Sequence, residues 1–301
     1  MIDFPRYLAA KKSIDDRALN RFVWEQLVLT ISTRTLHHPL RVLELGCGIG
    51  TMVERLLEWG LAEKITYLGI DTQAENLRVA ENRLRKWGQE NGYQVGLNSG
   101  EITLEKGKVT WQISFERVDA TSFQGTQGSY DLLIANAFLD LIDVPNGLSN
   151  FERWLQPEGL FYFTINFDGE TIFEPSSDVD YESKIIDLYH QSMNERLIDG
   201  RPSGDSCTGR HLFSHLQTAG AQILAAGASD WVVFPNNQEY PKDEAYFLHC
   251  ILDFFESSLK SKSELRQEKL AAWLAERREQ INRGGLIFIA HQLDFLGSFP
   301  H

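Results

Sequence analysis

Three glycines at alternate positions, Gly46, Gly48 and Gly50, carry the strongest chemical signal in the sequence. They directly follow the apolar run Leu40–Leu45, which predicts a short buried β-strand, and residues 52–59 then repeat apolar side chains at helical spacing. Glycine lets the backbone adopt positive φ angles and approach a ligand closely, and the start of a helix offers free N–H groups. The segment therefore predicts a ligand site between a strand and a helix.

The dinucleotide-binding pattern GxGxxG does not fit this segment. Its third glycine lets helix and strand pack closely, but Thr51 stands at that position here. Acidic residues mark three successive apolar runs: Glu44 precedes the glycine turn, Asp71 closes the next run, and Asp119 follows the one after. A carboxylate can accept hydrogen bonds from both hydroxyls of a diol. A site edged by these acids favours a positively charged ligand over a pyrophosphate.

The sequence from Gly46 to Gly50, preceded by Glu44, resembles the first motif of the class I S-adenosylmethionine-dependent methyltransferases. The resemblance extends in order over roughly residues 40–167 and includes a turn similar to the family's LxPGG, in which Glu158 replaces the second-last glycine. It implies that Asp71 binds the ribose hydroxyls and Asp119 the adenine amino group. The cofactor would be S-adenosyl-L-methionine, with S-adenosyl-L-homocysteine as product. The cofactor-binding residues that we infer are Glu44, Gly46, Cys47, Gly48, Gly50, Asp71, Thr72, Asp119, Ala120, Asn136 and Ala137.

Alternating apolar runs and amphipathic segments must position these residues. The pattern predicts an α/β fold with a Rossmann-like doubly wound, mostly parallel sheet, and the resemblance implies seven strands with an antiparallel last strand and a helical cap or lid. Turns around residues 93–108 predict an inserted hairpin. The divisions that we expect are an N-terminal helical cap (1–38), a cofactor-binding core (39–167), and the rest of the core (168–301) with helical insertions at about 168–210 and 235–285 and a terminal strand at 286–297.

Local patterns predict further elements along the chain. Ser13 opens a possible capping sequence, so a second N-terminal helix is expected to begin there. Residues 167–180 show no clear periodicity and predict an irregular stretch, whereas residues 221–234 predict one strand. Helices are expected around residues 181–197, 210–219, 244–259 and 264–281.

Composition narrows the classes of partner. The 29 Lys and Arg against 42 Asp and Glu give a net charge of −13, which disfavours nucleic acid and anionic membranes as partners. Cys47, Cys207 and Cys250 form no CxxC pair, so no metal site is expected, and a reducing compartment is favoured. The charged N-terminus and the lack of a long apolar run indicate a cytoplasmic protein. A monomer or a homodimer remains open.

The methyl acceptor leaves weaker signals. Because the cofactor supplies an activated methyl group, a catalytic base is optional. His211 and His291 are candidate bases, since imidazole titrates near neutral pH, although either could have only a structural role. Tyr7, Lys11 and Arg17 are candidates for contacts with the methionine part of the cofactor. Aromatic residues that could line an acceptor pocket, or simply form core, are Phe167, Phe173, Tyr181, Tyr189, Tyr246, Phe247, Phe254 and Trp273.

The function that the sequence favours is methyl transfer from S-adenosylmethionine to an O, N, C or S nucleophile of a small molecule enclosed by a helical lid. The segment after the fourth strand, Asn136-Ala-Phe-Leu, lacks the two prolines typical of enzymes that methylate base amines. Two alternatives remain: a protein that binds S-adenosylmethionine without catalysis, and a nicotinamide-dependent oxidoreductase.

Overall fold

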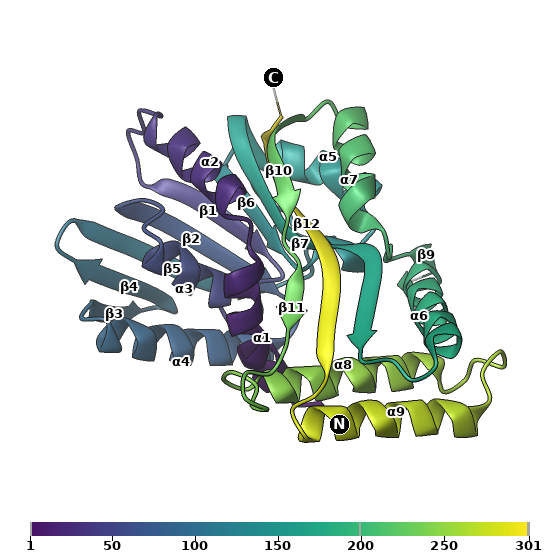
Figure 1. The fold of residues 1–301 in the computed structure, drawn as a ribbon. Coiled ribbons are helices and arrows are strands. Elements are labelled where there is room, and N and C mark those ends of the chain that lie inside the picture. The colour runs from purple at the N-terminus through teal and green to yellow at the C-terminus, as the bar shows by residue number, and fades with distance from the viewer. Residues whose placement is uncertain (1, 199, 300–301) are drawn as a thin grey trace.

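The computed structural model describes residues 2–198 and 200–299. A twisted sheet runs through the molecule, with helices on both faces and a helical group at one end (Figure 1). The helices are α1 (Phe4–Ala18), α2 (Arg21–Ser32), α3 (Thr51–Glu58), α4 (Ala74–Glu90), the 3₁₀ helix η1 (Leu139–Leu141), α5 (Val144–Trp154), α6 (Val179–Asn194), α7 (Thr208–Thr218), α8 (Glu244–Leu259) and α9 (Gln267–Asn282). None of these helices is both long and apolar enough to span a membrane.

The strands build one large sheet and a two-stranded ribbon. They are β1 (Leu40–Leu45), β2 (Lys64–Asp71), β3 (Gln94–Asn98), β4 (Glu101–Lys106), β5 (Val109–Arg117), β6 (Tyr130–Asn136), β7 (Leu155–Glu174), β8 (Leu197–Ile198), β9 (Arg201–Pro202), β10 (Gln222–Ala228), β11 (Trp231–Val233) and β12 (Ile287–Ser298). The main sheet has the order β10-β12-β7-β6-β1-β2-β5-β4-β3.

The expected seven-stranded core is confirmed within this sheet. Strands β5, β2, β1, β6 and β7 are parallel, β12 is antiparallel to β7, and β10 is the seventh strand, paired with β12. The sheet as a whole has ten strands, because the predicted hairpin, β3 and β4, pairs with β5 and β11 pairs with β12. Since parallel strands end at one edge, the turns after β1, β2, β5 and β6 meet there.

Side chains of β1 show why both faces of the sheet are covered. Val42 points into a buried cluster with residues of α2 and α3, whereas Leu43 and Leu45 point into a second cluster with residues of α5 and α7. Because successive side chains of a strand point to opposite faces, such a strand is apolar throughout. This burial explains the continuous apolar runs that end at the candidate site.

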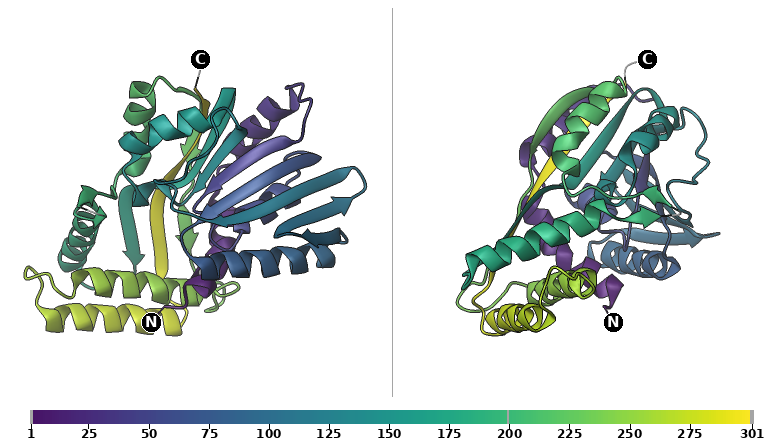
Figure 2. Two further views of the ribbon diagram at one scale, coloured as in Figure 1. Left: turned by 180° about the vertical axis from the view of Figure 1, so that it is seen from behind. Right: turned by 90° about the vertical axis from the view of Figure 1, so that its right-hand side faces the viewer.

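The expected irregular stretch at residues 167–180 is wrong, because β7 continues to Glu174. It extends past Thr164, its last residue paired with β6, and is held there by β12 through pairs such as Phe173 with Phe288. Residues 221–234 form two strands instead of one, since β10 and β11 pair with different parts of β12. The paired segments of β7 and β12 beyond Thr164, which we call the extended β7–β12 ribbon, pack against α8 and α9 (Figure 2).

The expected helix start at Ser13 is also wrong. Helix α1 runs through this residue, and the Ser13 hydroxyl donates to Glu244 Oε1 of α8 instead of capping a helix. The break comes at Asn20, whose side chain accepts from the Val23 N–H as the cap of α2. The Asn20 N–H donates to buried Asp294 of β12 at 2.8 Å. Tertiary hydrogen bonds therefore place the break between the two helices.

Candidate functional site

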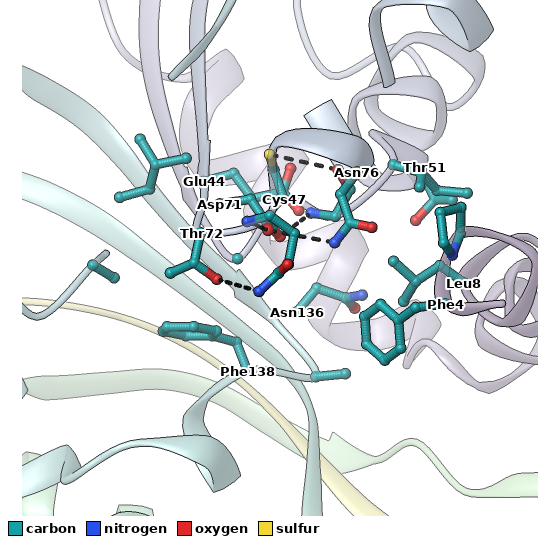
Figure 3. A pocket seen from close by; sticks show the side chains of 18 of the residues that line it. Phe4, Leu8, Glu44, Cys47, Thr51, Asp71, Thr72, Asn76, Asn136 and Phe138 are labelled. Carbon is teal, nitrogen blue, oxygen red and sulfur yellow. Dashed lines mark hydrogen bonds between the residues drawn. The ribbon is translucent and has the colours of Figure 1, made fainter. Parts of the chain in front are cut away.

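The glycine turn after β1 forms the floor of a cavity of about 560 Å³ at the carboxyl edge of the sheet (Figure 3). Gly46 has a φ of +62°, and a Cβ atom there would collide with the ring of Phe138. At Gly48, with φ +54°, a Cβ would come within 3.0 Å of Leu8 Cδ1 of α1. Both positions therefore require glycine, for backbone conformation and for space.

Most of the cofactor-binding residues inferred from sequence line this cavity, which we call the donor cavity. Gly50 does not line it but caps the start of α3, and Asp119 lines a neighbouring cavity together with Thr72 and Ala120. The Asp119 carboxylate accepts from the backbone N–H and the hydroxyl of Thr121 at 2.7 and 2.6 Å, as in a local turn. The predicted residues that line the donor cavity are Glu44, Gly46, Cys47, Gly48, Asp71, Thr72, Ala120, Asn136 and Ala137.

Asp71 connects the ends of two strands within the donor cavity. Its Oδ2 accepts from the Gly48 N–H at 3.0 Å, and its Oδ1 accepts from the Gln73 N–H at 2.7 Å. The Asn76 amide lies 3.4 Å from Oδ1. The side chain is only partly buried, so its carboxylate both shapes the glycine turn and remains accessible to a ligand hydroxyl.

Glu44 lies deeper in the same cavity. Burial raises its pKa to about 8, and the hydrogen bond from the Tyr67 hydroxyl and the charge of Arg55 oppose this shift only in part. A positive charge on a ligand would favour the ionised carboxylate. Among the described residues that line the cavity, Glu44, Asp71 and Glu75 are acidic and Lys11 is basic.

Helix α1 supplies a wall of the donor cavity, in which Lys11 was expected from the sequence but Phe4 and Leu8 were not. Phe4, Leu8 and Lys11 line the donor cavity, and their i, i+4, i+7 spacing places them on one face of the helix. This spacing in the sequence is the signal from which the helical wall could have been predicted. Arg17, a candidate cofactor contact, instead pairs with Glu244 at 2.7 Å. It lines neither the donor cavity nor the second cavity described below.

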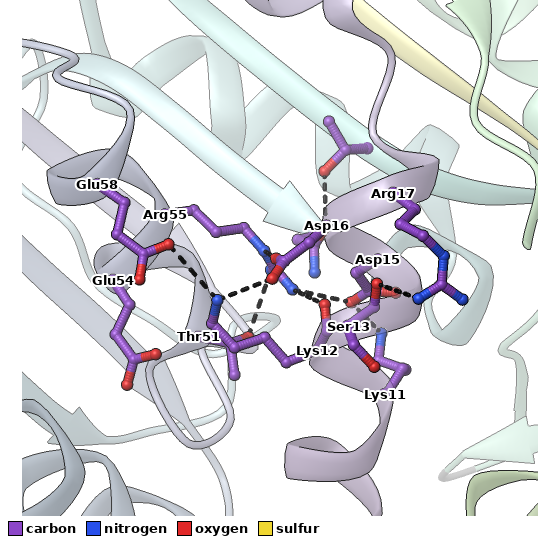
Figure 4. Close-up of polar contacts among 12 residues, drawn as sticks. Lys11, Lys12, Ser13, Asp15, Asp16, Arg17, Thr51, Glu54, Arg55 and Glu58 are labelled. Carbon is purple, nitrogen blue, oxygen red and sulfur yellow. Dashed lines mark hydrogen bonds and ion pairs between the residues drawn. The ribbon is translucent and has the colours of Figure 1, made fainter. Parts of the chain in front are cut away.

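A buried ionic network fixes α1 against α3 (Figure 4). The Arg55 guanidinium of α3 is fully buried and donates to Asp16 Oδ1 at 2.5 Å, with Asp15 Oδ2 at 3.5 Å. Asp15 also pairs with Lys11 at 3.0 Å and accepts from the Trp231 indole N–H at 2.9 Å. Because Arg55, Asp15 and Lys11 are buried together, loss of one of them would leave buried charge less well compensated. The network therefore holds the helical wall in place.

A second cavity of about 400 Å³, the acceptor cavity, adjoins the donor cavity. Residues of α1, α6 and α8 and of the extended β7–β12 ribbon form its walls. Of the aromatic candidates, Phe167, Tyr189 and Phe254 line it, whereas Phe173, Phe247 and Trp273 are core residues. Tyr7 also lines it. The residues shared by both cavities are Phe4, Leu8, Lys11, Ala137 and Leu141.

The two histidines proposed as bases lie elsewhere. His211 is on α7, half-exposed, with Nδ1 2.6 Å from Asp205 Oδ2. His291 is on β12, where its Nδ1 lies 2.7 Å from Asp230 Oδ1 and its Nε2 3.6 Å from Asp168 Oδ2. Neither residue lines the donor or the acceptor cavity. The structure therefore does not bring these candidates to the site, because their side chains engage carboxylates on other surfaces.

The donor cavity fits S-adenosylmethionine, the cofactor that the resemblance implies. The acids match a ligand with a sulfonium and an ammonium group, and they would repel the phosphates of a dinucleotide. The glycine turn leaves room for close approach of a ligand to the backbone, and apolar residues such as Ile70 and Val118 offer a surface for a ring. Over the described residues, no group of three or more His, Cys, Asp and Glu is arranged to hold a metal ion.

Comparison with known proteins supports this assignment. The family model described as a methyltransferase domain matches residues 43–161. A Bacillus halodurans protein assigned as a methyltransferase has a similar structure, with a TM-score of 0.51 and 12% identity over 91% of this chain and 97% of that one. Two others score lower: a Galdieria sulphuraria protein assigned as a sarcosine dimethylglycine methyltransferase (0.46; 14% identity; 93% and 84% covered) and geranyl diphosphate C-methyltransferase from Streptomyces coelicolor A3(2) (0.45; 12%; 92% and 77%). No curated protein matches the sequence.

The family match covers the glycine turn, the acid at the end of β2 and the strands that position them. The similarity to the Bacillus halodurans structure extends over nearly the whole chain and shows a shared fold. Residues 43–161 therefore match a methyltransferase domain, and the strand order of the sheet agrees with that match.

Proposed function

We propose that this protein transfers the methyl group of S-adenosylmethionine to a small molecule bound in the acceptor cavity. In this proposal Asp71 binds the ribose hydroxyls, the glycine turn contacts the cofactor through its backbone, and Glu44 faces its positive charge. Asp119 would contact the adenine from the neighbouring cavity, where Thr72 and Ala120 are shared walls. S-adenosylmethionine supplies a methyl group on a positively charged sulfur, which a nucleophile can displace.

One observation carries the proposal: the donor and acceptor cavities meet and share walls. Ala137 and Leu141, just after β6, line both, as do Phe4, Leu8 and Lys11 of α1. A ligand in each cavity would therefore place its reactive end near the same point. Holding two reactants in contact supplies much of the acceleration in a reaction of this kind.

The size and cover of the acceptor cavity support a small molecule as acceptor. Its volume of about 400 Å³ lies in the range of small-molecule pockets. Helices α1, α6 and α8 line it, and α6 and α8 lie within the insertions expected at about 168–210 and 235–285. We propose that these helices form the lid. A lid of this kind excludes water and hinders entry of a macromolecule.

The proposal is tested by incubating the protein with S-adenosylmethionine carrying a deuterated methyl group and a cell extract divided into a fraction below 1 kDa and a macromolecular fraction. Mass spectrometry should find the labelled methyl group in a small molecule. The same reaction with Asp71→Ala is the control and should lose most of the label. Label found only in macromolecules would refute the small-molecule acceptor. Cofactor binding without any label would favour the non-catalytic alternative.

A further inference from the structure

The acceptor cavity contains the carboxyl group of Asp140, one oxygen of which makes no hydrogen bond in the described part of the chain. Asp140 lies in the 3₁₀ helix η1 and lines this cavity. Its Oδ1 atom is buried and has no hydrogen-bond partner among residues 2–198 and 200–299. Leaving a buried carboxylate oxygen without a partner is costly, so such groups are rare unless a ligand satisfies them.

The surroundings of Asp140 do not neutralise it. Lys11 of α1 lies in the same cavity, but its ammonium is already paired with Asp15 at 3.0 Å. Arg196 lines the cavity as well, and no described ion pair joins it to Asp140. Burial raises the pKa of Asp140, and a hydrogen bond from its own backbone N–H and the charges of Arg196 and Lys11 oppose this shift. The other titratable groups that act on it or respond to it are Asp205, Tyr7 and Tyr189.

The position of Asp140 along the chain brings it to the meeting point of the two cavities. It stands between Ala137 and Leu141, which line both cavities. The remaining walls include several aromatic rings, such as those of Tyr189 and Phe255, which stack with centroids 3.8 Å apart. A flat apolar ligand would contact these rings, while a single polar group on it could reach the carboxylate.

We infer that Asp140 accepts the hydrogen bond, and then the proton, of a hydroxyl or amino group on a flat, aromatic or otherwise apolar acceptor. This inference rests on the proposed function. The bond between the methyl carbon and the acceptor oxygen or nitrogen forms as the bond between that carbon and sulfur breaks. Sulfur keeps the electron pair, and the acceptor proton passes to the Asp140 carboxylate. A carboxyl with a raised pKa suits this role, since it holds a proton closer to neutral pH.

The test uses two probes, 2-naphthol and its methyl ether 2-methoxynaphthalene, in which a methyl group replaces the hydroxyl hydrogen and so removes the hydrogen-bond donor, and follows their fluorescence as they bind. The wild-type protein should bind 2-naphthol about tenfold more tightly, the usual size of one hydrogen bond to a charged group. In Asp140→Leu this preference should disappear, and in Asp140→Asn it should be reduced. An unchanged preference in Asp140→Leu, or no binding of either probe to the wild type, would overturn the inference.

Two controls separate this inference from the proposed function. Asp143→Asn changes a nearby acid outside the acceptor cavity and keeps a residue that can cap α5, so it should leave the probe preference unchanged. The affinity of each variant for S-adenosylhomocysteine is measured in parallel. If the wild type fails to bind S-adenosylhomocysteine, the proposed function fails. If this affinity is intact but the probe preference does not depend on Asp140, only the present inference fails.

Protein stability gives an independent readout. Because burial raises the pKa of Asp140, its ionised form costs stability, and that cost grows as the pH rises through its folded pKa. Asp140→Leu should therefore raise the Tm, and the rise should be larger at pH 8 than at pH 5. A residue with a structural role would lower the Tm when replaced. A fall in Tm at pH 8 would contradict a carboxyl kept for ligand binding.

Discussion

Replacement of Asp71 by Asn gives the sharpest test of the donor cavity. The carboxylate accepts from the Gly48 and Gln73 N–H groups through different oxygens, and we propose that it also accepts from the ribose. An amide has one acceptor oxygen, so at least one hydrogen bond to a charged group is lost, which is worth about 1.5–3 kcal/mol. The Kd for S-adenosylmethionine should therefore rise by roughly 10-fold to 150-fold.

Isothermal titration measures this change, and circular dichroism checks that the variant is folded. The amide NH₂ must face one of the two backbone N–H donors, so the Tm should also fall by a few degrees, at about 2–4 °C per kcal/mol. Glu63→Gln, an exposed acid before the opposite end of β2, is the matched control and should change neither quantity. A folded Asp71→Asn variant whose Kd stays within twofold of the wild-type value would refute the assignment of Asp71.

Three further changes test the parts around it. Gly46→Ala should destabilise the protein, because a left-handed backbone costs about 1–2 kcal/mol for alanine and the added Cβ would displace Phe138. Thermal denaturation should show a lower Tm, and isothermal titration should show a weaker affinity for S-adenosylmethionine. Glu44→Gln should flatten the pH dependence of stability. Because the pKa of Glu44 is raised from 4.5 to about 8, the contribution of this side chain to stability is fully present below pH 4.5 and falls by at most about 5 kcal/mol as the pH rises through 8, which urea denaturation of variant and wild type at pH 5 and pH 9 measures. Arg55→Met should cost about 3 kcal/mol in urea denaturation, because Asp16 loses its buried partner; equal midpoints for variant and wild type would show that the network does not stabilise α1.

Local patterns were enough to predict the part of the site built from consecutive residues. The glycine turn follows β1 directly, and Asp71 ends β2, so strand ends and turn residues could be located from apolar runs and glycines. The hairpin β3–β4 and helices α8 and α9 could be predicted in the same way. For these elements the side chains that define the pattern are also the ones that the fold buries.

Features that depend on distant partners could not be predicted in this way. The strand β7 continues beyond Thr164 because β12, far along the chain, pairs with it. Asp140 carries no sequence signal of its own, since its importance lies in a missing partner within a cavity formed by several elements. His211 and His291 were candidate catalytic bases because imidazole titrates near neutral pH, but the fold places both residues outside the two cavities. Residue type suggests chemistry, but tertiary contacts decide which residues can take part.

The central claim is that the donor cavity binds S-adenosylmethionine. Isothermal titration of the purified protein with S-adenosylmethionine, S-adenosylhomocysteine and NAD in parallel tests it most directly. The first two ligands should bind with micromolar affinity, whereas NAD, whose phosphates meet Glu44, Asp71 and Glu75, should not bind measurably. Preference for NAD, or no binding of S-adenosylmethionine and S-adenosylhomocysteine, would contradict the account.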